Sequence, residues 1–376
     1  METSRTILIE SRDPLIFRDP RPAEAGLPIR TLDWPLPSAV IGAVRTRLGR
    51  QTSFDATTVQ RLKLISHVGP VLATHGPAGW ELAFPAPADA VLIPGKDSHA
   101  PAEICPLRPA PLRESEGTDL RSDLLPLFGG REEKPLRGPR FWTAAATLEW
   151  LKGSLVSKAY ATLGFDGGER QRRVHLEVEP TTFAAKEGQL FTTEGLEIGF
   201  KQNADQWPPQ PAAICSRIES IGNEWPDLEP LAPLGGERRL GYWSEPKIDW
   251  PAAPSELASV RRFRLQLITP AAFDLGWKPG WLARGGPPGL PDSKLKLVAA
   301  AVPRAVPHSG WDLTKRGSRG QKATRFLAPA GSVYFFESET EVDIRRLWLR
   351  SISDRPQDRL DGFGIVLCGE WKWLSE

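Results

Sequence analysis

The sequence predicts an α+β protein with two ferredoxin-like (RRM-like, βαββαβ) domains that carry long loop and hairpin insertions. In each half, the segments follow one another as strand, helix or crossover, strands, helix and strand. A chain of 376 residues is too long for one small core and suits two domains. Its 37 prolines and 34 glycines indicate many loops between short elements. We therefore expect an N-terminal domain over 1–243 and a C-terminal domain over 244–376, joined near a linker at 244–254.

In the first half, a strand-like run at 6–17 precedes a helix that begins near Ser38, a residue able to cap it. A segment with apolar residues on one side predicts a second helix at 141–152. The stretch 94–140 has no clear period and is expected to be a surface loop. Apolar or alternating runs between Gly/Pro turns predict strands at 62–74, 80–85, 90–94, 169–179 and 188–200.

In the second half, Phe263, Leu265 and Leu267 alternate with polar residues, which predicts a strand that begins at Arg261. Further strands are expected at 294–302, 333–336 and 364–371, and a short helix at 342–351.

Composition limits the function classes. The net charge of +2 is close to neutral, so any nucleic-acid binding has to rest on local clusters of charge. The three cysteines are odd in number and form no C-x-x-C pair, which argues against a disulfide framework or a structural zinc site. No window holds eighteen apolar residues in a row, and the N-terminus lacks the apolar core of a secretion signal. We expect a cytoplasmic protein without a metal, a cofactor or a membrane partner.

A basic loop at 315–325 is the first candidate binding site. It contains five cations and no acid, and Gly317 and Gly320 would let backbone amides approach an anion. Such cations contact phosphates and read little sequence. The alternative is a solvated charge run with no ligand. The five cations are Lys315, Arg316, Arg319, Lys322 and Arg325.

A second basic cluster lies on the hairpin predicted at 169–200. Strand alternation puts Arg173 and His175 on one face, and Arg170 and Arg172 on the other. A hairpin with basic faces could lie along RNA. The alternative is an exposed hairpin whose charge is balanced by nearby glutamates.

The Gly-x-Gly at Gly362 and Gly364 is weak evidence by itself. A dinucleotide fingerprint needs a third glycine that opens a helix, whereas an apolar strand follows here, so we reject that reading. A tight turn before a strand is the simpler interpretation. No histidine has metal-ligand spacing, and no H-E-x-x-H, G-x-S-x-G or Walker motif is present. His175, beside arginines, could act as an acid or base in RNA cleavage, although a lone histidine is more often structural.

Several runs together resemble a known family. Asp13-Pro14-Leu15-Ile16-Phe17-Arg18-Asp19-Pro20-Arg21-Pro22 is similar to the pattern PLxFRDxRPF, and residues 37–46 are similar to PSxxxGAxRT. With Ala86-Pro87-Ala88-Asp89-Ala90, the stretch 310–336 and the terminal Gly362-Phe363-Gly364, the chain resembles RAMP proteins of CRISPR systems. Together these runs resemble the Cmr-module RAMP subunit of type III-B effectors that pairs with the large polymerase-like subunit. The chain departs from the pattern at Pro20 and Ala23, where the family usually has a glycine and an aromatic residue.

The resemblance implies a non-catalytic subunit of an antiviral ribonucleoprotein that holds the repeat-derived 5′ tag of the crRNA. It implies three partners: the crRNA, the large polymerase-like subunit and adjacent backbone RAMP subunits. Because related RAMPs include metal-independent endoribonucleases, processing of CRISPR RNA through His175 or His67 is the alternative, and a protein scaffold without RNA contact is a third reading. The expected RNA-binding residues are Arg18, Arg21, Ser38, Gly42, Arg45, Arg170, Arg172, Arg173, His175, Lys315, Arg316, Arg319, Lys322, Arg325, Gly362 and Gly364.

Overall fold

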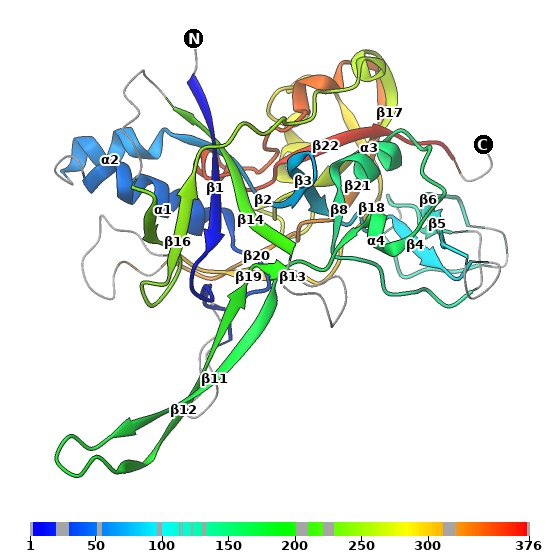
Figure 1. Ribbon diagram of the computed structural model, residues 1–376. Coiled ribbons are helices and arrows are strands. Elements are labelled where there is room, and N and C mark those ends of the chain that lie inside the picture. The colour runs from blue at the N-terminus through cyan, green and yellow to red at the C-terminus, as the bar shows by residue number, and fades with distance from the viewer. Residues whose placement is uncertain are drawn as a thin grey trace.

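The computed structural model describes residues 3–19, 30–50, 55–95, 100–112, 114, 116–121, 123–129, 133–200, 210–220, 229–310, 320 and 322–373. Within these residues the protein is a strand-rich mixture of α and β structure with few helices. Two antiparallel sheets share the largest hydrophobic core, and a long two-stranded ribbon extends away from them (Figure 1).

The first sheet contains nine strands, in the order β10-β8-β3-β2-β14-β1-β16-β15, with β13 paired to β14. Strand β1 lies between β14 and β16, and β2 lies on the far side of β14. The strands are β1 (Thr3–Ser11), β2 (Ser66–Gly76), β3 (Gly79–Pro85), β8 (Phe141–Thr143), β10 (Gly164–Phe165), β13 (Gly199–Phe200), β14 (Gln210–Ser220), β15 (Leu231–Pro233) and β16 (Leu240–Ser244).

Both faces of the first sheet are buried. The alternation along β1 sends Ile7 and Ile9 toward one core and Leu8 toward another. Helices α1 (Pro37–Arg50) and α2 (Ala56–Lys63) follow β1, and α1 packs Val40 and Val44 onto the face that holds Ile7 and Ile9. The opposite face packs on the second sheet.

The helix α1 begins one residue earlier than expected. Pro37 is its first residue, so Ser38 lies inside the first turn and is not the cap. Proline suits that position because its missing N–H would have had no partner there. The strand predicted at 62–74 is likewise displaced: α2 continues to Lys63, and β2 begins at Ser66.

The second sheet has four strands, in the order β18-β21-β17-β22, and every neighbouring pair is antiparallel. Its first strand, β17, therefore lies between its third and fourth strands, β21 and β22, and in the first sheet β1 likewise lies between two later strands, β14 and β16. In the described residues, the connections between the strands of the second sheet contain short turns, one short helix and the short paired strands Val306–His308 and Arg325–Leu327. The elements are η1 (Ser255–Ala258), β17 (Val260–Leu267), η2 (Gly280–Arg284), β18 (Leu295–Ala301), β21 (Val333–Val342), η4 (Ile344–Leu347), α5 (Pro356–Leu360) and β22 (Val366–Glu370).

The helix predicted at 342–351 is wrong. Strand β21 continues through Val342, which pairs with Val260, and only the four-residue 3-10 turn η4 follows. The Asp343 carboxylate accepts from the Arg345 backbone N–H at 3.2 Å and so begins the turn. Leu349 then has a φ of +52°, which an α-helix does not allow.

The remaining elements lie outside the two large sheets. The helix predicted at 141–152 is shorter, because β8 takes its first residues and Thr143 caps α3 by accepting from the Ala146 N–H at 3.1 Å. The loop predicted at 94–140 contains short strands as well. These elements are β4 (Ala90–Ile93), β5 (Ala102–Pro106), β6 (Arg108–Pro109), β7 (Leu127–Phe128), α3 (Ala144–Leu151), β9 (Ser157–Lys158), α4 (Tyr160–Leu163), β19 (Val306–His308) and β20 (Arg325–Leu327).

The predicted hairpin is confirmed. Strands β11 (Glu169–Val178) and β12 (Ala185–Glu197) pair with each other and form a sheet of their own, which we call the ribbon. Figure 1 shows the ribbon extending below the body of the molecule. At its base, Leu196 forms a bridge with Leu15, which ties the ribbon to the chain after β1.

Candidate nucleic-acid interface

Three stretches far apart in the sequence meet around Phe363. Its buried ring packs with Leu36, which immediately precedes α1, and with Leu327 of β20. The ring of His308 lies 5.2 Å from that of Phe363, centroid to centroid. The start of α1, the β19–β20 pair and the turn at 361–364, which we call the glycine loop, therefore form one site.

Arg45 joins α1 to the glycine loop. Its guanidinium forms an ion pair with Asp361 and donates to the backbone oxygens of Lys63 at 3.2 Å and Ile65 at 2.9 Å. The amide of Gln357 in α5 donates to the oxygen of Lys63 at 3.2 Å and to the Asp361 carboxylate at 2.9 Å. Arg45, predicted to bind RNA, thus uses both of its terminal nitrogens in contacts within the protein and holds the loop against the first half of the chain.

The two glycines of the loop are required by close packing. Gly362 has a φ of +85°, and a Cβ there would lie 2.7 Å from Nδ1 of His67 and 2.9 Å from its carbonyl oxygen. Gly364 has a φ of +74°, and its Cβ would lie 2.5 Å from Oγ of Ser353. Both residues are buried, so the structure places them in the interior.

His67 and His308 flank the loop and are held neutral. Burial is the main cause that lowers the pKa of His67 to about 4, and the charge of Arg45 lowers it further. Burial, and then Arg325, lower the pKa of His308 to about 4. Nδ1 of His67 lies 3.3 Å from the carbonyl oxygen of Asp361. Because a carbonyl oxygen can only accept, Nδ1 carries the proton and Nε2 is left as an acceptor.

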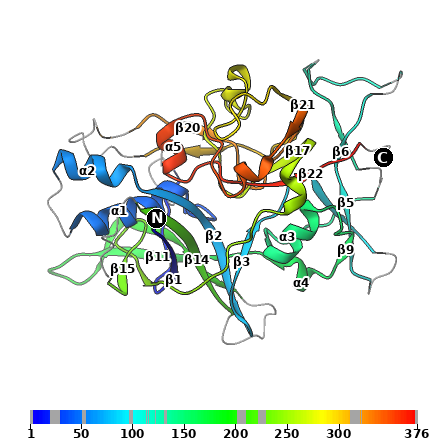
Figure 2. The same ribbon diagram turned by 90° about the horizontal axis from the view of Figure 1, so that it is seen from above.

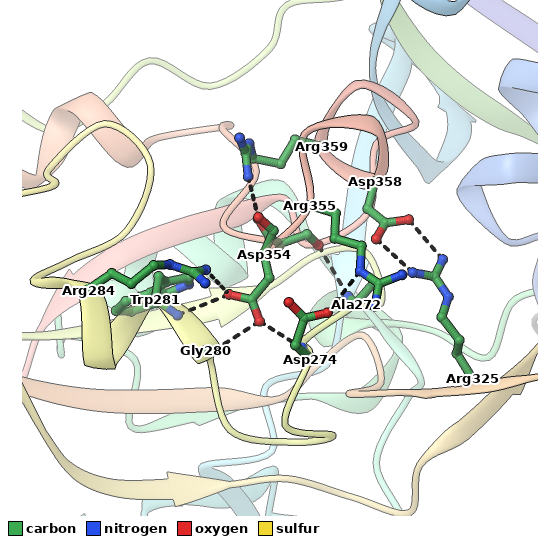
Figure 3. A network of polar contacts seen from close by, with 11 residues as sticks. Ala272, Asp274, Gly280, Trp281, Arg284, Arg325, Asp354, Arg355, Asp358 and Arg359 are labelled. Carbon is green, nitrogen blue, oxygen red and sulfur yellow. Dashed lines mark hydrogen bonds and ion pairs between the residues drawn. The ribbon is translucent and has the colours of Figure 1, made fainter.

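A polar network fixes the turn before the glycine loop (Figure 3). Oδ2 of the buried Asp354 accepts from the backbone N–H groups of Asp274 at 2.7 Å and Gly280 at 3.0 Å. Arg325 donates to both oxygens of Asp358, at 2.7 and 2.8 Å, and this bond is the main cause that raises the pKa of Arg325. Arg325, another predicted RNA contact, is therefore bound within the protein.

The ribbon presents the cations differently. Arg170 at its base donates to Asp33 at 2.7 Å, but no described residue forms an ion pair with the exposed Arg172 or Arg173. On the face of Arg173, His175 is stacked on Phe191 with ring centroids 5.2 Å apart. The assignment of residues to the two faces agrees with the pairing register.

The other predicted residues lie around the glycine loop and the base of the ribbon. Ser38 and Gly42 are half-buried, and a Cβ on Gly42 would meet nothing within 4 Å. Lys322 is exposed, and Arg18 pairs with Glu237 at 3.0 Å. Four predicted residues lie outside the part of the chain that the structure describes: Arg21, Lys315, Arg316 and Arg319.

One buried ion pair between the halves was not predicted from the sequence. Asp89, fully buried, accepts from the guanidinium of Arg264 in β17 and from the indole N–H of Trp150 at 2.9 Å. Arg264 also donates to the carbonyl oxygen of Trp150. Asp89 belonged to the run 86–90 that supported the family resemblance, but only its partners show that it joins α3 to the second sheet.

The described residues contain no group of three or more His, Cys, Asp or Glu side chains placed to hold a metal ion. In the same residues, no helix has the length and apolar character needed to cross a membrane.

Comparisons with known proteins place the chain in a family. The family described as CRISPR-associated protein (Cas_Cmr3) matches residues 7–371. No curated protein sequence matches the chain. Solved structures similar to the chain include the following three.

A chain of the cryo-EM structure of the Type III-B Cmr-beta bound to cognate target RNA and AMPPnP, state 1, is 14% identical, with a TM-score of 0.47 over 88% of this chain and 86% of that one. A second chain, from the Type III-B Cmr-beta bound to cognate target RNA, is 13% identical, with a TM-score of 0.44 over the same shares. A chain of the Csm3-Csm4 subcomplex in the type III-A CRISPR-Cas interference complex is 8% identical, with a TM-score of 0.42 over 98% of this chain and 99% of that one.

The family match spans nearly the whole chain and confirms the resemblance found in the sequence. The protein belongs to the Cas_Cmr3 family of CRISPR-associated proteins.

Proposed function

We propose that the protein is a non-catalytic subunit of a type III CRISPR ribonucleoprotein that binds the 5′ repeat-derived tag of the crRNA. In this proposal it also docks the large polymerase-like subunit and adjacent backbone RAMP subunits, in antiviral defence. The observation that carries the RNA-binding part is the ribbon, on which Arg172 and Arg173 are exposed and form no ion pair with any described residue.

Contacts link the base of the ribbon to the start of α1. The ion pair between Arg170 and Asp33 ties the base of the ribbon to the segment that leads into α1. Leu36, three residues further along, packs on Phe363, and the exposed Lys322 lies beside Gly310 next to His308. A single strand of RNA can follow this route from the ribbon to the start of α1, where N–H groups of the first turn favour a phosphate.

The ribbon supplies two kinds of RNA contact. Arg172 and Arg173 are exposed and can neutralise phosphates without first breaking an ion pair. The stacked rings of His175 and Phe191 offer an aromatic surface for an unstacked base. Stacking tolerates any base, so sequence readout by this face is weak.

We also propose that the two sheets are the centres of two ferredoxin-like domains, divided near residue 244. The shared strand order supports this, because the four strands β2-β14-β1-β16 and the four strands β18-β21-β17-β22 each place the first strand in sequence between the last two. The helix after β1 fits the βαββαβ pattern, whereas the described connections of the second sheet carry short turns, the β19–β20 pair and α5.

The endoribonuclease alternative is less well supported. His67 is 1% exposed and has a pKa of about 4, so it neither reaches an RNA nor titrates near neutral pH. His175 shares a 2.9 Å hydrogen bond with the hydroxyl of Thr193 and stacks on Phe191. These contacts suit a binding surface better than a proton-transfer group.

The test is to co-purify the protein with its neighbouring subunits and crosslink the bound RNA. The variant Arg172→Glu/Arg173→Glu reverses the ribbon charge, and Arg121→Glu/Arg345→Glu is the matched control with two exposed arginines elsewhere. We expect the crosslink to this subunit to be lost in the first variant and kept in the control. Equal crosslinking in both would contradict the ribbon as an RNA contact. Cleavage of a crRNA precursor that disappears in His175→Ala would favour the endoribonuclease instead.

A further inference from the structure

A group of arginines lies at the end of the first sheet that is away from the ribbon. Strand β14 pairs with β13 beside the ribbon base and ends where Glu219 pairs with Ser66 of β2. Around this far end, η2, η4, the turn after η4 and α5 each contribute one arginine. We call these residues the arginine face: Arg284, Arg346, Arg350 and Arg359.

The four side chains belong to one surface. Three of them, Arg346, Arg350 and Arg359, line the same hollow. Burial is the main cause that lowers the pKa of Arg359, and the nearby charge of Arg284 also lowers it. Figure 3 shows Arg284 and Arg359 beside Asp354, to which both donate.

In two ion pairs of this face the arginine is exposed and the carboxylate is not. The side chain of Arg284 is 59% exposed, whereas that of Asp354, 3.2 Å away, is 1% exposed. Arg350 is 58% exposed and its partner Glu219, at 3.3 Å, is 18% exposed. Arg346 is exposed, and no described residue forms an ion pair with it. A molecule that approaches this face from solvent therefore meets positive charge first.

The paired arginines keep donors for a second partner. Toward the described carboxylates, Arg350 uses Nη1 with Glu219 and Arg284 uses Nη2 with Asp354. A guanidinium carries five N–H donors and no acceptor. Each of these arginines can therefore bind a carboxylate of another molecule while it keeps its own.

The hollow between the arginines favours a protein over a nucleic acid. Its volume is about 320 Å³, and among the described residues that line it none is Trp, Tyr or Phe, so it offers no such ring to an unstacked base. An apolar centre with arginines around it is typical of protein interfaces. The apolar lining consists of Val68, Pro288, Leu349, Leu360 and Ile365.

We propose that the arginine face docks an acidic surface of the large polymerase-like subunit, with an aliphatic side chain of that subunit in the hollow. This inference rests on the proposed function, which takes the large subunit as a partner, and adds the surface and the chemistry of the contact. Subunits that share the RNA would adjoin the ribbon, where Arg172 and Arg173 are exposed. The arginine face lies at the opposite end of β14 and is left for a partner outside that path.

The experiment measures the affinity of the full chain, freed of nucleic acid, for the purified large subunit by biolayer interferometry at low and high salt. Arg346→Glu/Arg350→Glu reverses two charges of the arginine face, and Arg172→Glu/Arg173→Glu is the matched control on the ribbon. We expect about tenfold weaker binding in the first variant and a change below about twofold in the control. High salt should weaken the binding of wild type more than that of the first variant.

A second variant covers the risk that Arg350→Glu disturbs the fold through Glu219. Arg346→Glu alone breaks no ion pair with a described residue, so its melting temperature should equal that of wild type, and its affinity should fall about threefold. Leu360→Gln places an amide in the apolar lining and should weaken binding about fivefold. Unchanged affinity in this variant would remove the seated side chain from the contact.

RNA binding of the same variants separates the possible failures. Absence of binding between wild type and the large subunit, or equal affinity in wild type and both arginine-face variants, overturns the inference. Loss of RNA binding in those variants with unchanged affinity for the large subunit would assign the face to RNA and overturn it as well. Retained RNA binding in the ribbon variant would contradict the proposed RNA contact alone, because the affinity for the large subunit is measured without RNA.

Discussion

The glycine loop and the ribbon were both predicted to bind RNA, yet they are built in opposite ways. In the loop, Gly362 and Gly364 are buried, and the cation beside them, Arg45, is bound by a carboxylate and two carbonyl oxygens. In the ribbon, Arg172 and Arg173 are exposed, and no described residue pairs with them. Figure 2 shows α5, which carries the chain into the loop, at the boundary between the α1–α2 layer and the second sheet.

The difference shows that the same residue types in a sequence can have two roles. Glycines and arginines near a binding surface can hold the surface in shape or can touch the ligand. A cation that already has partners must lose them before it contacts a phosphate, whereas an exposed one gains the contact without that cost. Changes at the loop and its surroundings should therefore act on stability, and changes on the ribbon should act on affinity.

The largest effect is expected at the buried ion pair between the halves. Asp89→Ala leaves Arg264 buried without its carboxylate, which should lower the free energy of unfolding by about 3–5 kcal/mol. Denaturant unfolding measures this. The control Glu177→Ala breaks the exposed pair with Lys186 and should cost less than about 1 kcal/mol. Equal losses in the two variants would show that burial does not set the strength of these pairs.

The glycine loop should be nearly as sensitive. Gly362→Ala forces a Cβ against His67 at a φ of +85°, which combines backbone strain with overpacking and should cost about 3 kcal/mol. Thermal and denaturant unfolding report the loss, and RNA affinity measured well below the melting temperature should change little. A stable variant that has lost RNA binding would reassign the loop to direct contact.

As the pH falls, the region around the glycine loop should lose folding stability before the ribbon does. The pKa of His67 is about 4 in the folded protein and ordinarily 6.5. Between these two pH values His67 is therefore protonated in the unfolded chain and neutral in the folded protein. The contribution of neutral His67 to the free energy of unfolding is complete above pH 6.5 and is lost as the pH falls toward 4. Between pH 7.5 and pH 5 the loss should be about 2 kcal/mol. His67→Asn, which keeps a donor for Asp361, should remove this part of the pH dependence, and an unchanged profile would contradict it.

On the ribbon, affinity should change without stability. Arg172→Ala/Arg173→Ala should weaken RNA binding about tenfold and reduce the salt dependence of log Kd by about 1.5, because two phosphate contacts are lost from a single strand. The free energy of unfolding should stay within about 0.5 kcal/mol, since both side chains are exposed. Fluorescence anisotropy at several salt concentrations measures the slope. An unchanged slope would place the phosphates elsewhere.

The smallest effect is expected within α1. There a single substitution at Gly42 distinguishes a structural role from a direct contact with RNA. Gly42→Ala meets nothing within 4 Å and should stabilise the protein by about 1 kcal/mol, because glycine is a poor helix former. If RNA approaches α1 here, the added methyl group should weaken RNA binding while it raises the melting temperature. Higher stability with unchanged affinity would remove Gly42 from the RNA surface.

The sequence predicted local patterns well. Alternation of residue types gave the ribbon, its two faces and the strands of the second sheet, because a period of two depends only on neighbouring residues. It failed at 342–351, where apolar spacing resembled a helix but a strand end and a turn bury the same side chains. Packing on the second sheet overrode local preference there.

The candidate site could be predicted only in part. The residues around the loop were chosen for their type, but their roles depend on partners up to 316 positions away, as in Arg45 and Asp361. A basic residue with a distant acid looks the same in sequence as a basic residue with none. The role of Asp89 was equally hard to predict, since its ion-pair partner, Arg264, lies in β17.

The way the two sheets share their core has a consequence for synthesis on the ribosome. The core under α1 uses only residues between 7 and 243, so it can form once the first half has emerged. The larger core contains Leu8 and Val71 from the first sheet together with Val366 and Cys368 of the last strand. One face of the first sheet therefore stays open to water until the chain is nearly complete. During that interval the nascent protein exposes a broad apolar surface, and translation speed and chaperone capture should govern its yield.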